Sequence, residues 1–271
     1  MARRNDYFLG ETLSEQERLV AQAAGFEHEA RWLLDRIGIQ PGWRAVDVGC
    51  GPIGILSLLA ERVGKDGTVV GLEREPRFAE MARAIVAERG LSNVQVVQAD
   101  AHASGLERES FDFVHGRLVL ILRPKPESLL AEMVALARPG GLVAVEDIDE
   151  ISWFCHPPHP AWDTLLQVFQ TVCRQDGVDS FIGRRLPELM RAAGLVDTQF
   201  EVHVRADRPG EYRRTHLLSL FQSLGDTVIE RALLAEEELV ELMTSLKKHL
   251  DDPTTVVVRQ LLCQAWGRKP C

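Results

Sequence analysis

The sequence has no long uncharged apolar run and no closely spaced pair of cysteines. Because a membrane span needs a tract of roughly 18 apolar residues, none of the 271 residues is expected to cross a bilayer. The five cysteines form no CxxC pair, so neither a zinc site nor a disulfide framework is expected, and we predict free thiols. No apolar stretch follows the two arginines near the start, so a secretory signal does not fit. These absences predict a cytoplasmic protein without a membrane partner or a bound metal.

Lysine and arginine form no run in this chain, and the formal net charge is -9. Proteins that bind nucleic acid draw most of their affinity from phosphates neutralised by clustered basic residues. DNA and RNA are therefore not expected as partners. With 45% hydrophobic and 26% charged residues, the composition is that of an ordinary globular protein.

Predicted strands and helices alternate through the middle of the chain. The predicted strands are 45–48, 68–72, 94–98, 111–115 and 142–146, and the predicted helices between them are 53–63, 76–87 and 126–137. Strands that alternate with helices at this interval indicate a parallel sheet with right-handed crossovers. The sequence therefore predicts an α/β fold.

The regular alternation stops after Glu146, where insertions into the core are expected. The predicted parts are an N-terminal helical cover at 1–38, a core at 39–206 and 253–271, and cap insertions at 149–180 and 207–252. The second insertion is predicted to hold two or three helices, and 254–266 is predicted to be β-rich. We expect both insertions to lie over one sheet.

A glycine-rich loop follows the first predicted strand and opens a helix. Gly49-x-Gly51-x-x-Gly54 has the spacing of a nucleotide-binding loop, in which glycine permits a tight turn and a close approach of backbone to ligand. Glu73 closes the next strand about 20 residues later, where a carboxylate can accept hydrogen bonds from both ribose hydroxyls. A tight turn that binds no ligand, with Glu73 merely solvated, is the alternative that these features leave open.

Five motifs follow one another between Asp47 and Leu142. They are Asp47 before the glycine loop, Glu73, Gln98-Ala99-Asp100-Ala101, Phe111-Asp112-Phe113-Val114 and Arg138-Pro139-Gly140-Gly141-Leu142. Together they resemble the class I S-adenosylmethionine-dependent methyltransferases, and more narrowly the small-molecule enzymes of the ubiquinone- and menaquinone-biosynthesis type. The resemblance implies a Rossmann-like, seven-stranded, mostly parallel sheet with N-terminal helices and a helical cap from two insertions. It also implies S-adenosyl-L-methionine as cofactor and S-adenosyl-L-homocysteine as product.

The resemblance assigns roles to residues of the cofactor site. Asp47 would hold the methionine amino end and Glu73 the ribose, while Asp100 would contact the adenine amino group and Ala101 the ring. Arg117 would meet the cofactor carboxylate as a charge-assisted donor, or else lie at the surface. The remaining residues expected at the cofactor are Gly49, Cys50, Gly51, Arg74 and Gln22.

The N-terminal Tyr7-Phe8-Leu9-Gly10 and Glu17-Arg18-Leu19 look like a leader of some bacterial members of this family, in which a helix packs across the cofactor mouth. This would bring Tyr7 and Gln22 near the methionine end or the acceptor, and a helix that only covers core surface is the alternative. A protruding N-terminal helix could also exchange between subunits, so a homo-oligomer is a candidate assembly. His115-Gly116-Arg117-Leu118 departs from the Asn/Asp-Pro-Pro-aromatic signature of methylases that act on base or amide nitrogens.

The methyl acceptor is expected under the insertions, at the carboxyl ends of the strands. Aromatic residues that could line an apolar pocket there, or else pack as core, are Trp153, Phe154, Trp162, Phe169 and Phe221. The candidate acceptor contacts are Tyr7, Trp153, His156 and His159. A small, partly hydrophobic metabolite is the expected partner.

Catalysis of methyl transfer is expected to depend mainly on orientation, which can supply on the order of 7 to 11 kcal/mol in well-aligned reactions. A dedicated base is therefore optional. His156 and Asp147 are the candidates for that role, and each has a purely structural alternative.

Two other functions remain open on the sequence alone. An NAD(P)-dependent oxidoreductase would use Glu73 for NAD, or Arg74 for a 2′-phosphate, but neither Tyr7 nor Tyr212 has the lysine four residues later that forms the short-chain dehydrogenase dyad. A non-catalytic binding protein on a methyltransferase fold is the second, because fold does not fix function. We predict a methyltransferase that moves a methyl group to an O, N or C atom of a small metabolite by in-line displacement.

Overall fold

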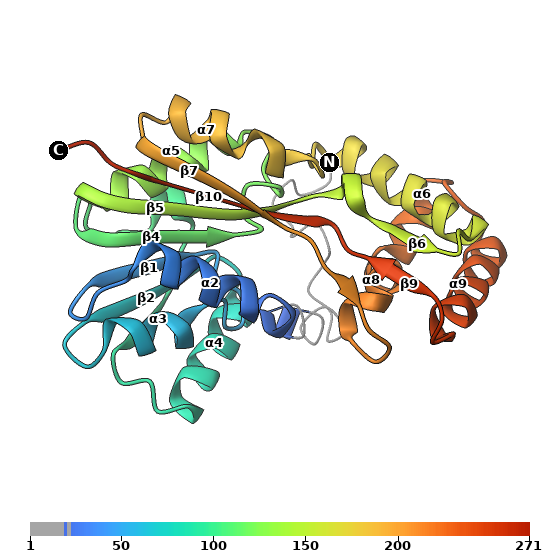
Figure 1. The fold of residues 1–271 in the computed structure, drawn as a ribbon, viewed down its shortest axis with the longest axis horizontal. Helices are drawn as coiled ribbons and strands as arrows, with labels where there is room; N and C mark the ends of the chain where they lie inside the picture. Colours follow the sequence, from blue (N-terminus) through green and yellow to red (C-terminus); the bar gives the residue numbers. More distant parts are fainter. Residues whose placement is uncertain (1–18, 21–22) are drawn as a thin grey trace.

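The computed structural model describes residues 19–20 and 23–271, and its main feature is one seven-stranded sheet. The strands of this sheet are β1 (Arg44–Val48), β2 (Thr68–Glu73), β3 (Val94–Gln98), β4 (Phe111–Arg117), β5 (Ala137–Asp149), β7 (Val196–His203) and β10 (Leu261–Arg268). Their order is β3-β2-β1-β4-β5-β10-β7 (Figure 1), and β10 runs antiparallel to both its neighbours while the pairs from β3 to β5 are parallel. The predicted Rossmann-like, mostly parallel sheet is confirmed.

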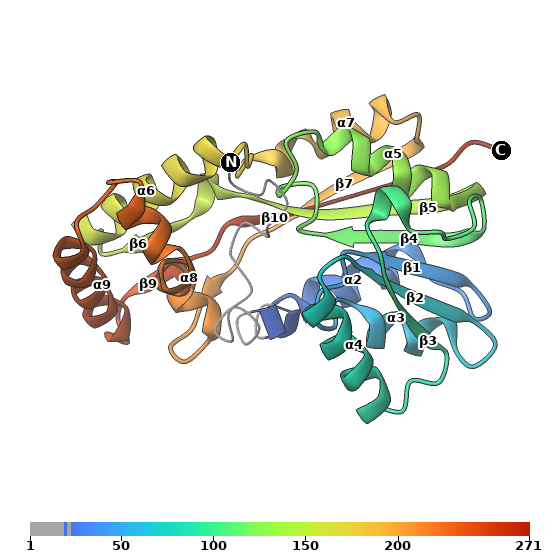
Figure 2. The same ribbon diagram turned by 180° about the vertical axis from the view of Figure 1, so that it is seen from behind.

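Helices cover both faces of this sheet because successive side chains of a strand point to opposite faces and both faces carry buried apolar residues. The core helices are α2 (Glu27–Ile37), α3 (Leu56–Val63), α4 (Pro76–Glu88), α5 (Pro126–Leu136) and α7 (Leu186–Ala192). Val46 and Val48 of β1 belong to the core that α5 and α7 cover. Ala45 of the same strand points to the opposite face, in the core that α2 and α3 cover. Figure 2 shows the two helical layers from behind.

A cap stands beyond one end of the sheet. It contains α6 (Pro160–Asp176), α8 (His216–Glu230), α9 (Glu236–Asp251) and the short strands β6 (Phe154–His156), β8 (Ala206–Asp207) and β9 (Val256–Val258). The short strands form a second sheet in the order β6-β9-β8. The arrowhead of β4 points toward the cap in Figures 1 and 2, so the cap faces the carboxyl ends of the parallel strands. Ligands of open α/β sheets bind at this end.

Element boundaries differ from the prediction in two places. The segment 254–266, predicted as one β-rich stretch, is divided, because β9 pairs with β6 and β8 while β10 joins the main sheet. The helix predicted from residue 53 begins at Leu56, since residues 51–55 form turns. Strands of two or three residues are too short to show an alternating pattern.

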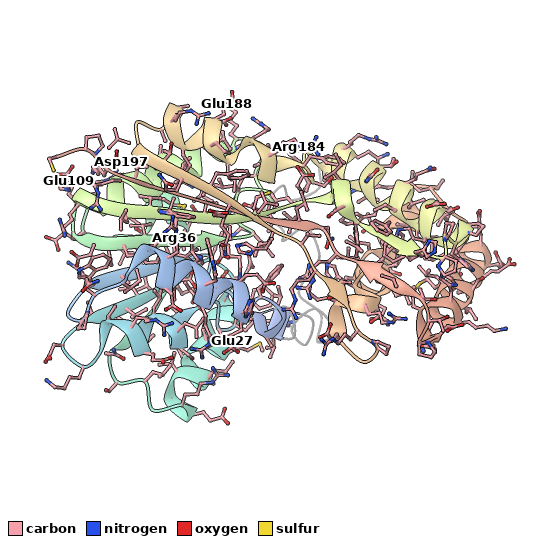
Figure 3. All side chains as sticks on the ribbon, viewed as in Figure 1. Glu27, Arg36, Glu109, Arg184, Glu188 and Asp197 are labelled. Atoms are coloured by element: carbon pink, nitrogen blue, oxygen red, sulfur yellow. The ribbon has the colours of Figure 1, made fainter. Side chains whose placement is uncertain are left out.

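The end of β5 anchors the chain where it leaves the sheet for the cap. Arg184, in the short helix η3 (Ile182–Arg185), donates from Nη2 to Asp149 Oδ1 at 2.7 Å. Figure 3 shows Arg184 beyond the end of α7, on the side toward the cap. Among the helices that the structure describes, none combines the length and the apolar character needed to cross a membrane.

Candidate functional site

A single cavity lies between the carboxyl ends of the strands and the cap. From the core, its lining includes Asp47, Gly49, Cys50, Gly51, Glu73, Arg74, Ala99, Ala101, Arg117, Leu118, Ile121, Arg123 and Ile148. From the cap and the chain around it, the lining includes Phe169, Val178, His216, Leu220 and Gln260. Leu19 and Ala23, at the N-terminal side, also line it. One continuous space is therefore bounded by the glycine loop at one end and by the cap at the other.

The glycine loop is tied to the second strand by its own backbone. The N–H groups of Gly49 and Cys50 both donate to the carbonyl oxygen of Leu72, at 2.7 and 3.1 Å. Gly49 has a φ of 68°, and a Cβ at this position would lie 2.5 Å from Val119 Cγ1. Only glycine satisfies both the left-handed backbone and the close approach. The loop thus presents bare backbone to the cavity.

Glu73 joins this loop to the start of the next helix. Its Oε2 accepts the N–H of Gly51 at 2.8 Å, and its Oε1 accepts the N–H of Glu75 at 2.8 Å. Burial raises the pKa of Glu73, and the backbone N–H groups partly oppose that rise. The carboxylate is held in one orientation at the cavity wall, where it can still accept hydrogen bonds from a ligand.

Asp47 is buried at the end of β1 and also faces the cavity. Its Oδ2 accepts the N–H of Ile55 at 3.0 Å, and its Oδ1 accepts from Nδ1 of His115 at 2.7 Å. The carboxylate therefore links the glycine loop to β4, the neighbouring strand.

His115 is fully buried between two carboxylates. Its Nδ1 bonds to Asp47, and its Nε2 donates to Glu146 Oε1 at 2.8 Å. Burial alone would lower the pKa of His115, but Asp47 and Glu146 together raise it to about 9. The ring is therefore an imidazolium at neutral pH.

Glu146 extends this contact across the sheet. Gln264 of β10 donates from Nε2 to Glu146 Oε2 at 2.6 Å, and His203 of β7 donates from Nε2 to Gln264 Oε1 at 2.9 Å. Burial opposes ionisation of Glu146, yet the hydrogen bond from His115 and its positive charge lower the pKa of this carboxyl. Hydrogen-bonded polar side chains thus form a continuous line across five adjacent strands.

A pH titration of stability tests the charge on His115. The pKa of about 9 in the folded state compares with 6.5 for a free imidazole, so the stabilisation is fully present below the lower value and is lost as pH rises through the higher one. Between about pH 7 and about pH 9.5 we expect the free energy of unfolding of the parent to fall by at most about 3 kcal/mol relative to His115→Asn. Urea unfolding at several pH values measures this. Parallel pH curves for the two proteins would contradict a charged His115.

Most residues predicted for the cofactor lie together at the cavity. They are Asp47, Gly49, Cys50, Gly51, Glu73, Arg74, Ala101 and Arg117. Arg117 Nη2 donates to the carbonyl oxygen of Gly54 at 3.5 Å, and its guanidinium carbon lies 5.3 Å from the centroid of the Phe26 ring. Arg74 pairs with Glu75 at 2.8 Å. Burial raises the pKa of Cys50 well above its usual value, so this wall carries a neutral thiol.

Asp100 and Asp147 each accept a backbone N–H group. Asp100 Oδ1 accepts the N–H of His102 at 2.9 Å and caps a short 3₁₀ helix, while Ala99 and Ala101 on either side of it line the cavity. Asp147 is fully buried, and its Oδ2 accepts the N–H of Leu120 at 3.2 Å. Burial raises the pKa of Asp147 well above its usual value. The described lining includes neither carboxylate.

The candidate acceptor contacts His156, His159 and Trp153 all lie in the cap, outside the described cavity lining. His156 is exposed on β6. His159 accepts the N–H of Ala161 at Nδ1 as the N-cap of α6, and its ring stacks on His249 at 4.7 Å. Trp153 is buried, with its ring centroid 5.6 Å from that of Trp162. Tyr7 and Gln22 lie outside the described residues.

Sequence reasoning missed the polar residues at the cap end of the cavity, His216 and Gln260. His216 begins α8 directly after a short 3₁₀ helix that contains Arg213 and Arg214, so the segment has the pattern of a basic surface. Gln260 lies between β9 and β10. Both are buried and line the cavity. Across residues 19–20 and 23–271, no group of three or more His, Cys, Asp or Glu side chains is arranged to hold a metal ion.

A family model described as a methyltransferase domain matches residues 39–190. The nocamycin O-methyltransferase of Saccharothrix syringae is 37% identical over 120 residues, which are 44% of this chain and 43% of that protein. The match thus spans less than half of that relative's length. The demethylmenaquinone methyltransferase of Geobacillus stearothermophilus is 28% identical over 204 residues, which are 70% of this chain and 87% of that protein.

One solved structure matches the whole chain in fold. It is phosphoethanolamine N-methyltransferase 2 of Haemonchus contortus in complex with phosphomonomethylethanolamine and S-adenosylhomocysteine. The TM-score is 0.64 at 17% identity, and the match covers 100% of this chain and 61% of that one. At this identity the likeness concerns the fold alone.

Proposed function

This chain belongs to the methyltransferase-domain family and uses S-adenosylmethionine as its methyl donor, and we propose that it methylates an O, N or C atom of a small, partly hydrophobic metabolite. The observation that carries this proposal is the single cavity shared by the glycine loop and the cap. When donor and acceptor occupy one cavity, the protein can align them and displace water from between them. The sulfonium of the donor supplies an already activated methyl group.

The cofactor end of the cavity fits the charges of this donor. Glu73, Asp47 and Ala101 all line this end of the cavity. We assign Glu73 to the ribose hydroxyls, Asp47 to the ammonium group and Ala101 to the adenine ring. Nη1 of Arg117 is buried and has no hydrogen-bond partner among the described residues. A donor atom in that state is suited to the cofactor carboxylate.

The acceptor end is mostly apolar, with two polar groups. Phe169, Leu220 and Ile148 offer carbon surface, and His216 and Gln260 offer hydrogen-bonding groups. This composition suits a small molecule with an apolar body and one polar anchor. We assign to His216 the polar contact with the acceptor that the sequence alone suggested for His156. The printed names of two relatives, nocamycin O-methyltransferase and demethylmenaquinone methyltransferase, support an acceptor of this class.

A bulky residue at the acceptor end tests the proposal. Leu220→Trp should fill the space beside His216, so transfer to any accepted metabolite should fall at least about tenfold, whereas the affinity for S-adenosylhomocysteine should change by less than about threefold. Release of S-adenosylhomocysteine with a panel of phenolic, enolic and amine acceptors measures transfer, and calorimetry measures affinity.

Gln222→Trp is the matched control, because Gln222 lies exposed on the same helix. It should leave both transfer and affinity unchanged. Transfer by Leu220→Trp at the parental rate would place the acceptor elsewhere. Cofactor binding without methylated product across the whole panel would instead favour a non-catalytic protein.

A further inference from the structure

A line of polar side chains crosses the interior of the main sheet and ends at the cavity. Its members stand on adjacent strands, in the order Asp47, His115, Glu146, Gln264 and His203. The strand residues on the same face of the sheet, such as Ala45, Phe113, Ala144 and Trp266, are apolar and buried. Asp47 is the member that faces the cavity.

Stability alone gives little reason for this arrangement. Removing charges from water is costly, and well-packed apolar residues often replace a buried ion pair without loss of stability. A buried network does, however, fix its members in one orientation, because each would lose hydrogen bonds by turning away. The end of the line at Asp47 is where such a fixed orientation would affect a ligand.

The same network also adjoins the positively charged wall of the cavity. Glu146 is in register with Arg117 of β4, and its backbone carbonyl accepts the N–H of Leu118 at 2.8 Å. Arg117 lines the cavity as Asp47 does. The cavity is therefore lined by an anion that His115 contacts directly and by a cation on the same strand as His115. An ammonium and a carboxylate on one carbon require one charge of each sign.

We propose that His115 is a positioning residue, whose imidazole holds the Asp47 carboxylate toward the charged amino-acid end of the methyl donor. This inference rests on the proposed function. In this proposal the amino-acid end of the ligand meets Asp47 and Arg117, and the adenosine end meets Glu73 and Ala101. A change at His115 should therefore affect the amino-acid end alone.

Two ligands separate this role from a merely structural one. S-adenosylhomocysteine carries the amino-acid end, and 5′-methylthioadenosine lacks it. Glutamine at position 115 can reach Glu146 from the place of Nε2, whereas asparagine can reach Asp47 from the place of Nδ1. His115→Gln should weaken S-adenosylhomocysteine about tenfold or more and leave 5′-methylthioadenosine nearly unchanged. His115→Asn should keep most of the affinity for S-adenosylhomocysteine that His115→Gln loses. His203→Gln, at the far end of the line, should leave both affinities unchanged.

Calorimetry on the full chain, with thermal unfolding of each variant, decides the outcome. An equal loss for both ligands in His115→Gln, or no loss for either, would overturn the proposal. If His115→Gln does not fold, His115→Ser, which reaches neither carboxylate, replaces it with the same expected ratio of losses. Failure of the parent to bind S-adenosylhomocysteine would refute the proposed function, and it would be evident before any variant is compared.

Discussion

A Glu73→Ala variant is expected to bind S-adenosylhomocysteine at least about 100-fold more weakly than the parent, since hydrogen bonds to charged groups contribute about 1.5 to 3 kcal/mol each. Glu73 has two tasks that alanine cannot perform. Its two oxygens accept the N–H groups of Gly51 and Glu75, and we propose that the same carboxylate also accepts hydrogen bonds from the ribose hydroxyls. The loss should therefore combine a released loop with a missing ligand contact. Calorimetric titration measures it.

Glu80→Ala is the matched control for this prediction. Glu80 lies exposed on α4, within a few residues of Glu73 but pointing to solvent. It should bind S-adenosylhomocysteine like the parent. If Glu73→Ala also bound it like the parent, the assignment of Glu73 to the ribose would be refuted.

Gly54→Ala should weaken S-adenosylhomocysteine binding at least as much as Glu73→Ala does, because the added methyl group meets Asp47. Gly54 has a φ of 49°, and its Cβ would overlap Asp47 Oδ2 and lie 2.9 Å from the carbonyl oxygen of Cys50. The added Cβ would meet the buried Asp47 carboxylate and the Cys50 backbone at once, so the loop or Asp47 must move. We expect no measurable binding of S-adenosylhomocysteine and a lower midpoint of thermal unfolding.

Gly42→Ala separates this clash from the ordinary cost of a left-handed backbone. Gly42 has a φ of 84°, and a Cβ there would have nothing within 4 Å. Gly42→Ala should lower the free energy of unfolding only by the roughly 1 to 2 kcal/mol that a left-handed backbone costs alanine. It should keep its cofactor affinity. Equal behaviour of the two variants would show that the contact between Gly54 and Asp47 is not what the loop requires.

The residues that gather at the loop end of the cavity could be predicted from the sequence because their signals are local. The glycine spacing, Asp47 two residues before Gly49 and Glu73 at the end of the next strand are fixed by short-range chain geometry. The sheet follows from the alternation of strands with helices. The carboxylate of Asp100 caps a helical turn while its alanine neighbours line the cavity, so its contact with the adenine amino group stays a prediction.

The acceptor half could not be predicted, because its residues meet only in the folded chain. Phe169, His216 and Gln260 come from three separate segments, and no spacing in the sequence relates them. His156 was favoured by its place in an insertion, yet a three-residue strand holds it exposed. The polar line had one visible signal, namely a histidine in the apolar run of β4, but its partners lie on other strands.

Calorimetric titration of the full chain with S-adenosylhomocysteine, with NADH and NADPH in parallel cells, tests the central claim most directly. The cavity should bind one S-adenosylhomocysteine per chain, Glu73→Ala should weaken that binding at least about 100-fold, and neither nicotinamide should give a saturable signal. Tight, saturable binding of NADH or NADPH with no response to S-adenosylhomocysteine would contradict the account.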